Sequence, residues 1–293
     1  MVLVEGRNKQ YSMDGYMKSN LDIIKEQINN HDNDFVCVVD GFEGVGKSVC
    51  AMQIGHYVDP TLTIDRICFS SDDFKDKVLN AEKGQCIIYD EAITGAFSRE
   101  AILSLNVMLI KLMAQIRQKN LFIIMVLPSF FDLDKNLALW RSKFLVHCHY
   151  GKNYQRGFFR FANLDKKKEI YIEGKKLYKY PKSPNKWSFY GRFTKHYTID
   201  EKIYRAKKLK SLKDEDQERL CIRKLRLQRD SFIVYLKNMN HTQEDISYVS
   251  DFFDEGVSQQ AINKVLIKHN KKQLTKRLLT LKTKYGGVEP EKE

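Results

Sequence analysis

The chain has 293 residues, of which 43% are hydrophobic and 30% charged, with a formal net charge of +13. This composition is typical of a folded globular protein and excludes a disordered or fibrous chain. The longest apolar stretches, 101–113 and 121–131, are interrupted by Lys111 and Pro128 and are shorter than the ~20 residues that a membrane helix needs. The N-terminus lacks the pattern of a secretory signal peptide, so we expect a cytoplasmic protein without a membrane partner.

Short apolar runs alternate with helical periodicity in the first half of the chain. A short helix is expected at 20–29, and further helices from the glycine-rich segment to about residue 57, over 71–81 and over 99–119. The helix at 99–119 is apolar nearly all round and is therefore expected to be buried. Buried strands are expected at 35–39, 67–69, 86–89, 121–127 and 144–149. This alternation predicts an α/β fold in which helices cover both faces of a parallel sheet.

The pattern changes after Tyr150. Residues 158–162 and 169–178 favour a β-hairpin, residues 182–195 are rich in aromatic and basic side chains, and the chain is expected to be helical from about Asp200. None of the six cysteines forms a C-x-x-C pair, which favours free, mostly buried thiols over a zinc ribbon or a disulfide framework.

Charge is distributed unevenly along the chain. Residues 151–293 contain 34 Lys and Arg against 18 Asp and Glu, a net charge of +16, which leaves −3 for residues 1–150. A near-neutral half joined to a basic half suggests an enzymatic part and a part that binds a polyanion. The alternative is that the basic surface only keeps the protein in solution.

Residues 41–48, GFEGVGKS, match the phosphate-binding pattern G-x-x-x-x-G-K-[ST] in full. The glycines allow backbone N–H groups to curl around a phosphate, and the following helix points its positive end at the same anion. Lys47 is expected to reach the β- and γ-phosphates of ATP, and the hydroxyl of Ser48 to bind Mg²⁺. The expected nucleotide contacts are Gly41, Glu43, Gly44, Val45, Gly46, Lys47, Ser48 and Val49.

Asp90 and Glu91 follow the buried strand at 86–89. Asp90 is expected at the carboxyl end of that strand, where it would hold Mg²⁺ opposite Ser48. Glu91 would lie near the water that attacks the γ-phosphate and could polarise it. The alternative for Glu91 is a solvated loop acid.

Three more polar residues are candidates for the catalytic machinery. Ser129 follows the strand at 121–127 and would sense the γ-phosphate if that strand lies between the other two; otherwise it would cap a helix. Arg117 and Arg141, like Arg99, could stabilise transition-state charge on a neighbouring subunit's nucleotide, although an ordinary salt bridge is the alternative for each.

Together, the phosphate-binding loop, the strand ending in Asp90-Glu91 and the segment IRQKN (116–120) before LFIIMVLPS (121–129) resemble the additional-strand ATPases. Within them, the resemblance is to the HerA–FtsK DNA translocases and the Zot-like (zonular occludens toxin-like) proteins of phages and mobile elements. It covers about residues 33–150 and implies a RecA-like P-loop NTPase. It places the phosphate-binding pair at Lys47 and Ser48, the acids at Asp90 and Glu91, and a polar residue at Ser129, where translocases often have Gln.

We therefore expect four parts: a helical extension (1–32), an ATPase core (33–150), a basic aromatic β-subdomain (151–198) and a helical nucleic-acid-binding region (199–293). In the last part, 242–246 and 256–266 resemble the halves of a helix-turn-helix, although a plain helical hairpin is the alternative. Val257, Ala261, Ile262 and Val265 would then pack inward, and Ser258, Gln259, Asn263 and Lys264 would face a major groove. The rings of 158–192 could stack on unpaired bases, although a small aromatic core is the simpler interpretation for most of them.

The expected activity is ATP hydrolysis, with ATP and Mg²⁺ as cofactors, that drives movement or remodelling of nucleic acid. DNA is favoured as the partner, and a homo-oligomeric ring as the assembly. Two alternatives stay open: an ATP-switched helicase loader or transposition helper, and a DNA-binding regulator that only senses nucleotide. His147 and His149 alternate on one strand, but two polar residues at a strand edge are a simpler interpretation than a metal pair.

Overall fold

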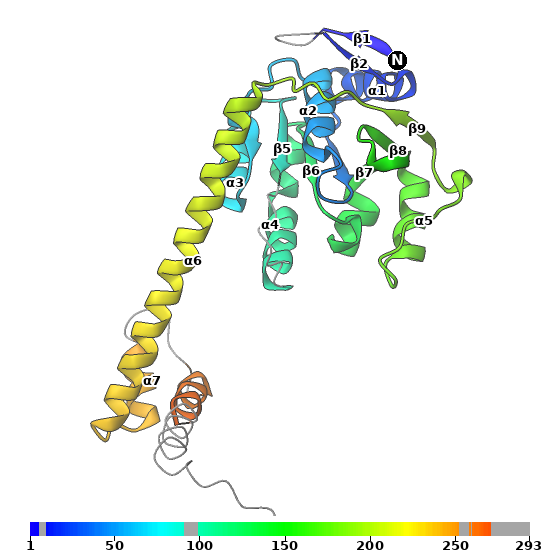
Figure 1. Ribbon diagram of the computed structural model, residues 1–293. Coiled ribbons are helices and arrows are strands. Elements are labelled where there is room, and N and C mark those ends of the chain that lie inside the picture. Colours follow the sequence, from blue (N-terminus) through cyan, green and yellow to red (C-terminus); the bar gives the residue numbers. More distant parts are fainter. Residues whose placement is uncertain (6–9, 91–98, 252–257, 259, 271–293) are drawn as a thin grey trace, which may run out of the picture. The chain divides into compact units, whose positions relative to one another are not determined.

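The computed structural model describes residues 1–5, 10–90, 99–251, 258 and 260–270 (Figure 1). The chain divides into two compact units, Met1–Lys213 and Asp214–Glu293. The first unit is an α/β structure built on a central sheet, and the second is helical.

The central sheet has seven strands in the order β4-β5-β6-β3-β7-β8-β9. Five are parallel: β3 (Phe35–Asp40), β4 (Ile67–Cys68), β5 (Cys86–Asp90), β6 (Phe122–Val126) and β7 (Ser142–His149). β8 (Phe158–Ala162) and β9 (Phe189–Arg192) extend it with antiparallel pairings. Because β6 lies between β3 and β5, the carboxyl ends of all three strands meet at one edge.

Helices cover both faces of this sheet, as the alternating pattern predicts (Figure 1). In β3, Cys37 and Val39 belong to one buried cluster and Val36 and Val38 to the other, because successive strand side chains point to opposite faces. The first cluster includes α1 (Gly15–Asn30) and α2 (Lys47–Val58); the second includes α3 (Ser71–Asn80), α4 (Arg99–Gln118) and α5 (Leu164–Gly174).

Shorter elements complete the first unit. Strands β1 (Val2–Val4) and β2 (Tyr11–Met13) form an antiparallel pair. Single turns occur at η1 (Ile64–Arg66), η2 (Phe130–Asp132), η3 (Leu137–Arg141), η4 (Lys152–Tyr154) and η5 (Pro184–Lys186).

The five expected buried strands and the strand at 158–162 are confirmed. Two other expectations are wrong: the hairpin partner at 169–178, and a helix at 99–119 that is buried nearly all round. The hairpin partner expected at 169–178 is instead largely in α5, because Asn163 caps that helix by accepting a hydrogen bond from the Lys166 amide at 3.1 Å. Helix α4 is not buried all round: Val107 and Ile110 are 43% and 50% exposed, and the buried residues within 106–118 form a stripe. The segment 151–198 contributes β8 and β9 to the central sheet.

The second unit contains the end of α6 (Glu201–Asn238), α7 (Gln243–Asp251) and helical residues 260–270. Ile233, Ile246 and Ile262 form its small apolar core, with Val265 partly buried against it. Ser258, Asn263 and Lys264 are exposed, and Ala261 is half-buried, while Val257 and Gln259 lie outside the described residues. The helix-turn-helix thus stays a prediction, with its inward-facing Ile262 and Val265 placed as expected.

Five buried cysteines and the exposed Cys221 are free thiols, as expected. None of the described helices combines the length and the apolar character needed to cross a membrane.

Candidate functional site

The glycine-rich loop 41–48 connects the carboxyl end of β3 to the first residue of α2. Gly41 has φ +135° and lies so close to β7 that a Cβ there would be 2.1 Å from the Cys148 carbonyl oxygen. Gly46, at the N-cap of α2, has φ +99° in the left-handed region. These two positions require glycine, and the loop they shape wraps the amino end of a helix, where backbone N–H groups attract anions.

Lys47 folds back over this loop. Its ammonium donates hydrogen bonds to the carbonyl oxygens of Gly41 at 2.7 Å and Phe42 at 3.0 Å. Burial lowers the pKa of Lys47, an effect that the charges of Asp40 and Asp90 oppose. The lysine is therefore held at the mouth of the loop, where a phosphate could replace the carbonyl oxygens as its partner.

Asp90 ends β5 and lies on the same side of the sheet, with 2% of its surface exposed. The hydroxyl of Tyr204 in α6 donates to Asp90 Oδ2 at 2.5 Å. The ammonium of Lys208, one turn further along α6, lies 3.6 Å from Asp90 Oδ1. Burial and the Asp90 charge raise the pKa of Tyr204, so its hydroxyl stays a donor.

These residues line a pocket of about 630 Å³. One wall is the loop with Asp90; the other comes from Arg156, from Tyr197 and from the start of α6. The full lining is Glu43, Gly44, Gly46, Lys47, Ser48, Val49, Asp90, Arg156, Tyr197, Tyr204, Arg205, Lys208, Leu209 and Leu212.

Two side chains with oxygen ligands suited to Mg²⁺ line this pocket. Ser48 offers a hydroxyl, and Asp90 a carboxylate that accepts a hydrogen bond from Tyr204. Within the described part of the chain, no group of three or more His, Cys, Asp or Glu side chains could hold a metal. Mg²⁺ keeps several waters and binds through one or two protein oxygens and substrate phosphates, so a hydroxyl and a carboxylate such as those of Ser48 and Asp90 could hold it.

The other candidates of the sequence lie elsewhere. Ser129 is the N-cap of η2, where its hydroxyl accepts from the Phe131 amide at 3.2 Å, and it is not among the pocket's lining residues. Arg141 donates to buried Asp34 at 2.5 Å, and Arg117 lies 3.8 Å from the same carboxylate, at the amino end of β3. Glu91 lies outside the described residues, as does the side chain of Arg99.

A buried network supports the loop from behind. Asp40, the last residue of β3, is fully buried; it accepts hydrogen bonds from the Phe130 amide at 3.0 Å and from the Tyr180 hydroxyl. Its other oxygen lies 2.9 Å from Nδ1 of His147, whose ring stacks on Tyr180 at 4.1 Å. Asp40 thereby ties the strand that enters the loop to η2 and β7.

Sequence reasoning missed Asp40, Arg156, Tyr197, Tyr204 and Lys208. Asp40 had one available signal, because a carboxylate directly before the glycine-rich loop interrupts an otherwise apolar run. Nothing local marks Tyr204 and Lys208 among the many basic and aromatic residues of the second half. Only the folding of the chain brings them to Asp90.

Rings and cations alternate on the antiparallel part of the sheet. His147, Arg160 and Tyr190 are paired across β7, β8 and β9, and so are His149, Phe158 and Arg192. We call these two rows the β7–β9 face. Arg192 lies 4.6 Å from the Phe158 ring, and Arg160 lies 5.9 Å from the Tyr190 ring. Tyr190 is 43% exposed, and Arg192 is exposed as well.

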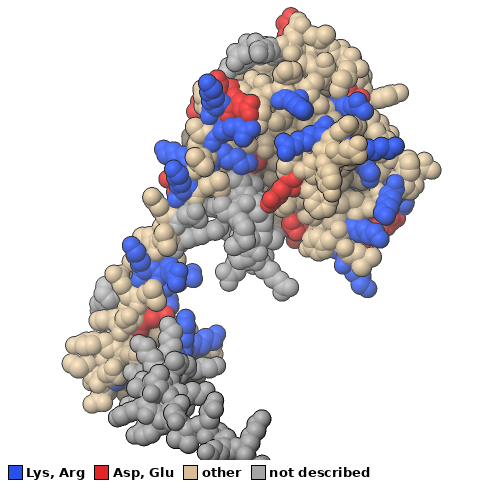
Figure 2. Space-filling view, viewed as in Figure 1, with Lys and Arg blue, Asp and Glu red and all other residues tan. Residues whose placement is uncertain are grey.

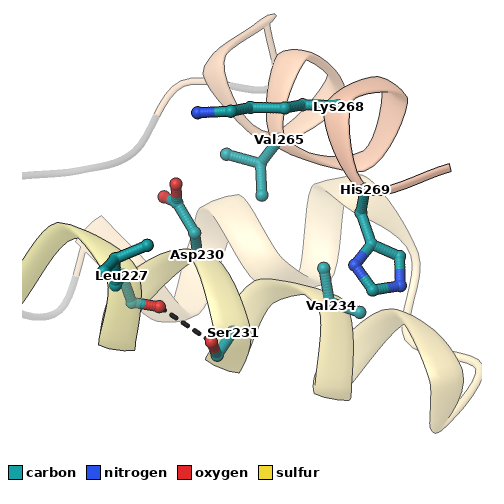
Figure 3. Close-up of a pocket in the computed structure, with 7 residues that line it drawn as sticks. All are labelled: Leu227, Asp230, Ser231, Val234, Val265, Lys268 and His269. Carbon is teal, nitrogen blue, oxygen red and sulfur yellow. Dashed lines mark hydrogen bonds between the residues drawn. The ribbon is translucent and has the colours of Figure 1, made fainter. Parts of the chain in front are cut away.

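The second unit has a groove of about 250 Å³ between α6 and residues 260–270 (Figure 3). Val234 and Val265 face each other across it, and Ser231 donates to the Leu227 carbonyl oxygen at 2.8 Å. Its remaining lining residues are Asp230, Lys268 and His269. The hydroxyl of Ser231 is thus engaged within its own helix, and the groove lacks the glycine loop and strand-end acid of the first pocket.

Comparison with known proteins adds no identification: the sequence matches no protein-family model and no curated protein. The site is therefore defined by its own geometry.

Proposed function

We propose that the protein is a P-loop ATPase with a RecA-like core that uses ATP and Mg²⁺ to move or remodel nucleic acid. The observation that carries this proposal is that Lys47, Ser48 and Asp90 line one pocket, although Lys47 and Ser48 begin α2 and Asp90 ends β5. The strand order also supports it, because β6 separates the strand of the glycine loop from the strand of the acid, as expected for an additional-strand ATPase.

Each residue has a chemical role in this proposal. The N–H groups of 41–48 bind the phosphates, and Lys47 exchanges its two carbonyl partners for β- and γ-phosphate oxygens. Ser48 and Asp90 hold the cation, which when bound neutralises charge that develops on the phosphates. Glu91 follows Asp90 in the chain and would orient the attacking water. Ser129 would contribute through the Asp40 network, because the amide of the next residue, Phe130, donates to Asp40 and to the Tyr180 hydroxyl.

Nucleic acid is the proposed partner because the second half carries a net charge of +16. Figure 2 shows one face of the molecule, on which Lys and Arg side chains outnumber Asp and Glu. On the β7–β9 face, the exposed residues Tyr190 and Arg192 offer both components of single-strand recognition, since a guanidinium group attracts phosphates and an exposed ring stacks on bases. DNA is favoured, and a ring of identical subunits is the proposed assembly, by the resemblance to translocases.

The test is the rate of ATP hydrolysis by the purified protein with and without single- and double-stranded DNA. We expect DNA to raise the rate and Lys47→Ala to abolish it, while Lys135→Ala, which removes an exposed lysine outside the pocket, leaves it unchanged. A rate indifferent to every form of DNA would exclude a motor.

An ATP-switched loader or transposition helper is the second candidate. The contact of α6 with Asp90 favours it, because a helix that touches the cation ligands can respond to nucleotide without translocation. Displacement of a protein roadblock from DNA would identify a motor, whereas a loader would leave the roadblock in place. A Glu91→Gln protein with unchanged turnover would instead favour a regulator that senses nucleotide.

A further inference from the structure

The hydroxyl of Tyr204 is bound to Asp90, one of the two side chains that the proposed function assigns to Mg²⁺. It donates a hydrogen bond to Asp90 Oδ2 at 2.5 Å. The tyrosine is 4% exposed, and its ring packs against Phe69 and Tyr197 at 5.5 and 5.7 Å. Tyr204 is thus a buried, well-packed side chain and not a surface residue that touches the pocket by chance.

Lys208 places a positive charge at the same carboxylate. Its ammonium is 3.6 Å from Asp90 Oδ1 and 3.3 Å from the Tyr204 hydroxyl. Both oxygens of Asp90 therefore have a partner from α6, spaced four residues apart so that they project from one side of the helix. The positive charge of the ammonium thus lies beside the carboxylate to which a divalent cation would bind.

Two further contacts hold the start of α6 on the core. Asp200 caps the helix, with Oδ1 accepting from the Lys202 amide at 2.7 Å. Lys207 donates to the carbonyl oxygens of Ile64 at 3.1 Å and Ile67 at 2.7 Å, and lies 3.4 Å from Asp73. The first two turns of α6 are therefore anchored beside the pocket as a unit.

We propose that the first two turns of α6 are an autoinhibitory latch that competes with Mg²⁺ for Asp90. This inference rests on the proposed function, because it assumes that Asp90 binds Mg²⁺ with nucleotide. Mg²⁺ requires ligand oxygens at about 2.0–2.1 Å in a nearly octahedral arrangement, which a phenol hydrogen-bonded to the carboxylate ligand obstructs. An ammonium on the same carboxylate adds repulsion of a second cation. Binding of Mg²⁺–ATP then requires release of Tyr204 and Lys208.

A supporting role for Tyr204 makes the opposite prediction. If the phenol only oriented Asp90 for the metal, as groups outside the ligand shell often do, its removal would weaken Mg²⁺–ATP binding. If Tyr204 is a latch, its removal strengthens Mg²⁺–ATP binding, because the ligand no longer has to break the hydrogen bond between Tyr204 and Asp90. The sign of the change therefore separates the two roles.

The first measurement is the affinity of the full-length protein for a fluorescent ATP analogue, with Mg²⁺ and with EDTA. We expect Tyr204→Phe and Lys208→Ala each to strengthen Mg²⁺-dependent binding by about 10-fold, the effect of one hydrogen bond to a charged group, with a smaller change in EDTA. Tyr57→Phe is the matched control, because it removes another tyrosine–carboxylate hydrogen bond, to Asp22. Lys202→Ala is the control for Lys208, since this exposed lysine lies in the same turns of α6.

The second measurement is amide hydrogen exchange at residues 201–209 of the wild-type protein. We expect Mg²⁺–ATP to accelerate exchange there at least several-fold. Nucleotide binding with unchanged exchange, or weaker binding by Tyr204→Phe, would overturn the latch while leaving the ATPase proposal intact. Binding by the two latch variants but not by the wild type would support a strong latch. No binding by any of these proteins would remove both proposals.

Discussion

Asp40 and His147 form a buried pair directly behind the glycine-rich loop, with 2.9 Å between Asp40 Oδ1 and Nδ1 of the histidine. Asp40 is fully buried and His147 is 7% exposed. The pair links β3 to β7, so the loop begins from a strand whose end is fixed on the side opposite β6. A carboxylate with three hydrogen-bonding partners is a rigid support for a phosphate-binding loop.

Replacing Asp40 with Ala is expected to lower the free energy of unfolding by about 3 kcal/mol or more, because it leaves the Phe130 amide, the Tyr180 hydroxyl and His147 without their shared buried partner. Chemical denaturation followed by circular dichroism measures this loss. Asp65→Ala, at an exposed position, is the control and should change stability by no more than about 0.5 kcal/mol. Equal stability of the two variants would contradict a supporting role for Asp40.

Lys167 predicts a dependence of stability on pH. Its side chain is fully buried, donating to backbone oxygens of η3 and to Ser142, and burial lowers its pKa to about 7. In the unfolded chain a lysine titrates near 10.4, so between about pH 7 and 10 the unfolded state binds more protons than the folded one. Raising the pH through this window therefore stabilises the folded state.

The measurement compares the wild type with Lys167→Met, which cannot titrate at this position. The free energy of unfolding of the wild type should rise relative to the variant by up to about 1.4 kcal/mol per pH unit between pH 7 and 10. Parallel curves for the two proteins would show that Lys167 keeps its proton in the folded state.

Arg141 and Arg117 should differ although both lie near Asp34. Asp34 is buried, and Arg141 contacts it at 2.5 Å, whereas Arg117 is 50% exposed and 3.8 Å away. Arg141→Ala should lower the free energy of unfolding by about 2 kcal/mol, because it removes the closest partner of a buried carboxylate. Arg117→Ala should lower it by less than about 1 kcal/mol.

A transition-state role in a neighbouring subunit would appear in mixing experiments. If Arg117 acts in trans, mixing inactive Lys47→Ala and Arg117→Ala subunits restores part of the ATPase rate, because some interfaces then combine an intact loop with an intact arginine. No recovery at any mixing ratio would exclude Arg117 from this role.

Arg192 should contribute to binding of single-stranded nucleic acid at the β7–β9 face. Arg192→Ala is expected to weaken binding of an oligothymidine several-fold and to reduce the salt dependence of the binding constant by about 0.7 in the logarithmic slope, as for the loss of one phosphate contact. Fluorescence anisotropy at several salt concentrations measures both. Lys75→Ala, an exposed position on α3, is the control; equal losses in the two variants would indicate general charge attraction instead of a site on this face.

The sequence by itself determined the parallel strands and the glycine-rich loop that follows β3. Continuous apolar runs such as 35–39 and 121–127 have no solvated face, as expected of central strands, and the spacing of Gly41, Gly46 and Lys47 predicts a phosphate-binding loop. Local periodicity also predicted α2 and α3. It misjudged residues 169–178, where β-branched and aromatic side chains favour a strand but packing against β7 and the Asn163 cap select a helix.

Only the tertiary structure decided what shares the pocket with the loop. Strand order is set by contacts between residues distant in the chain, so the sequence could not place β6 between β3 and β5 or bring Tyr204, 114 residues away, to Asp90. Nor could the sequence show that Arg141 lies away from the pocket, because an arginine at a helix end has the same local sequence pattern whether it binds a phosphate or a buried carboxylate. Side-chain chemistry is encoded locally, whereas the partner of each charged group is selected by the packing of the whole sheet.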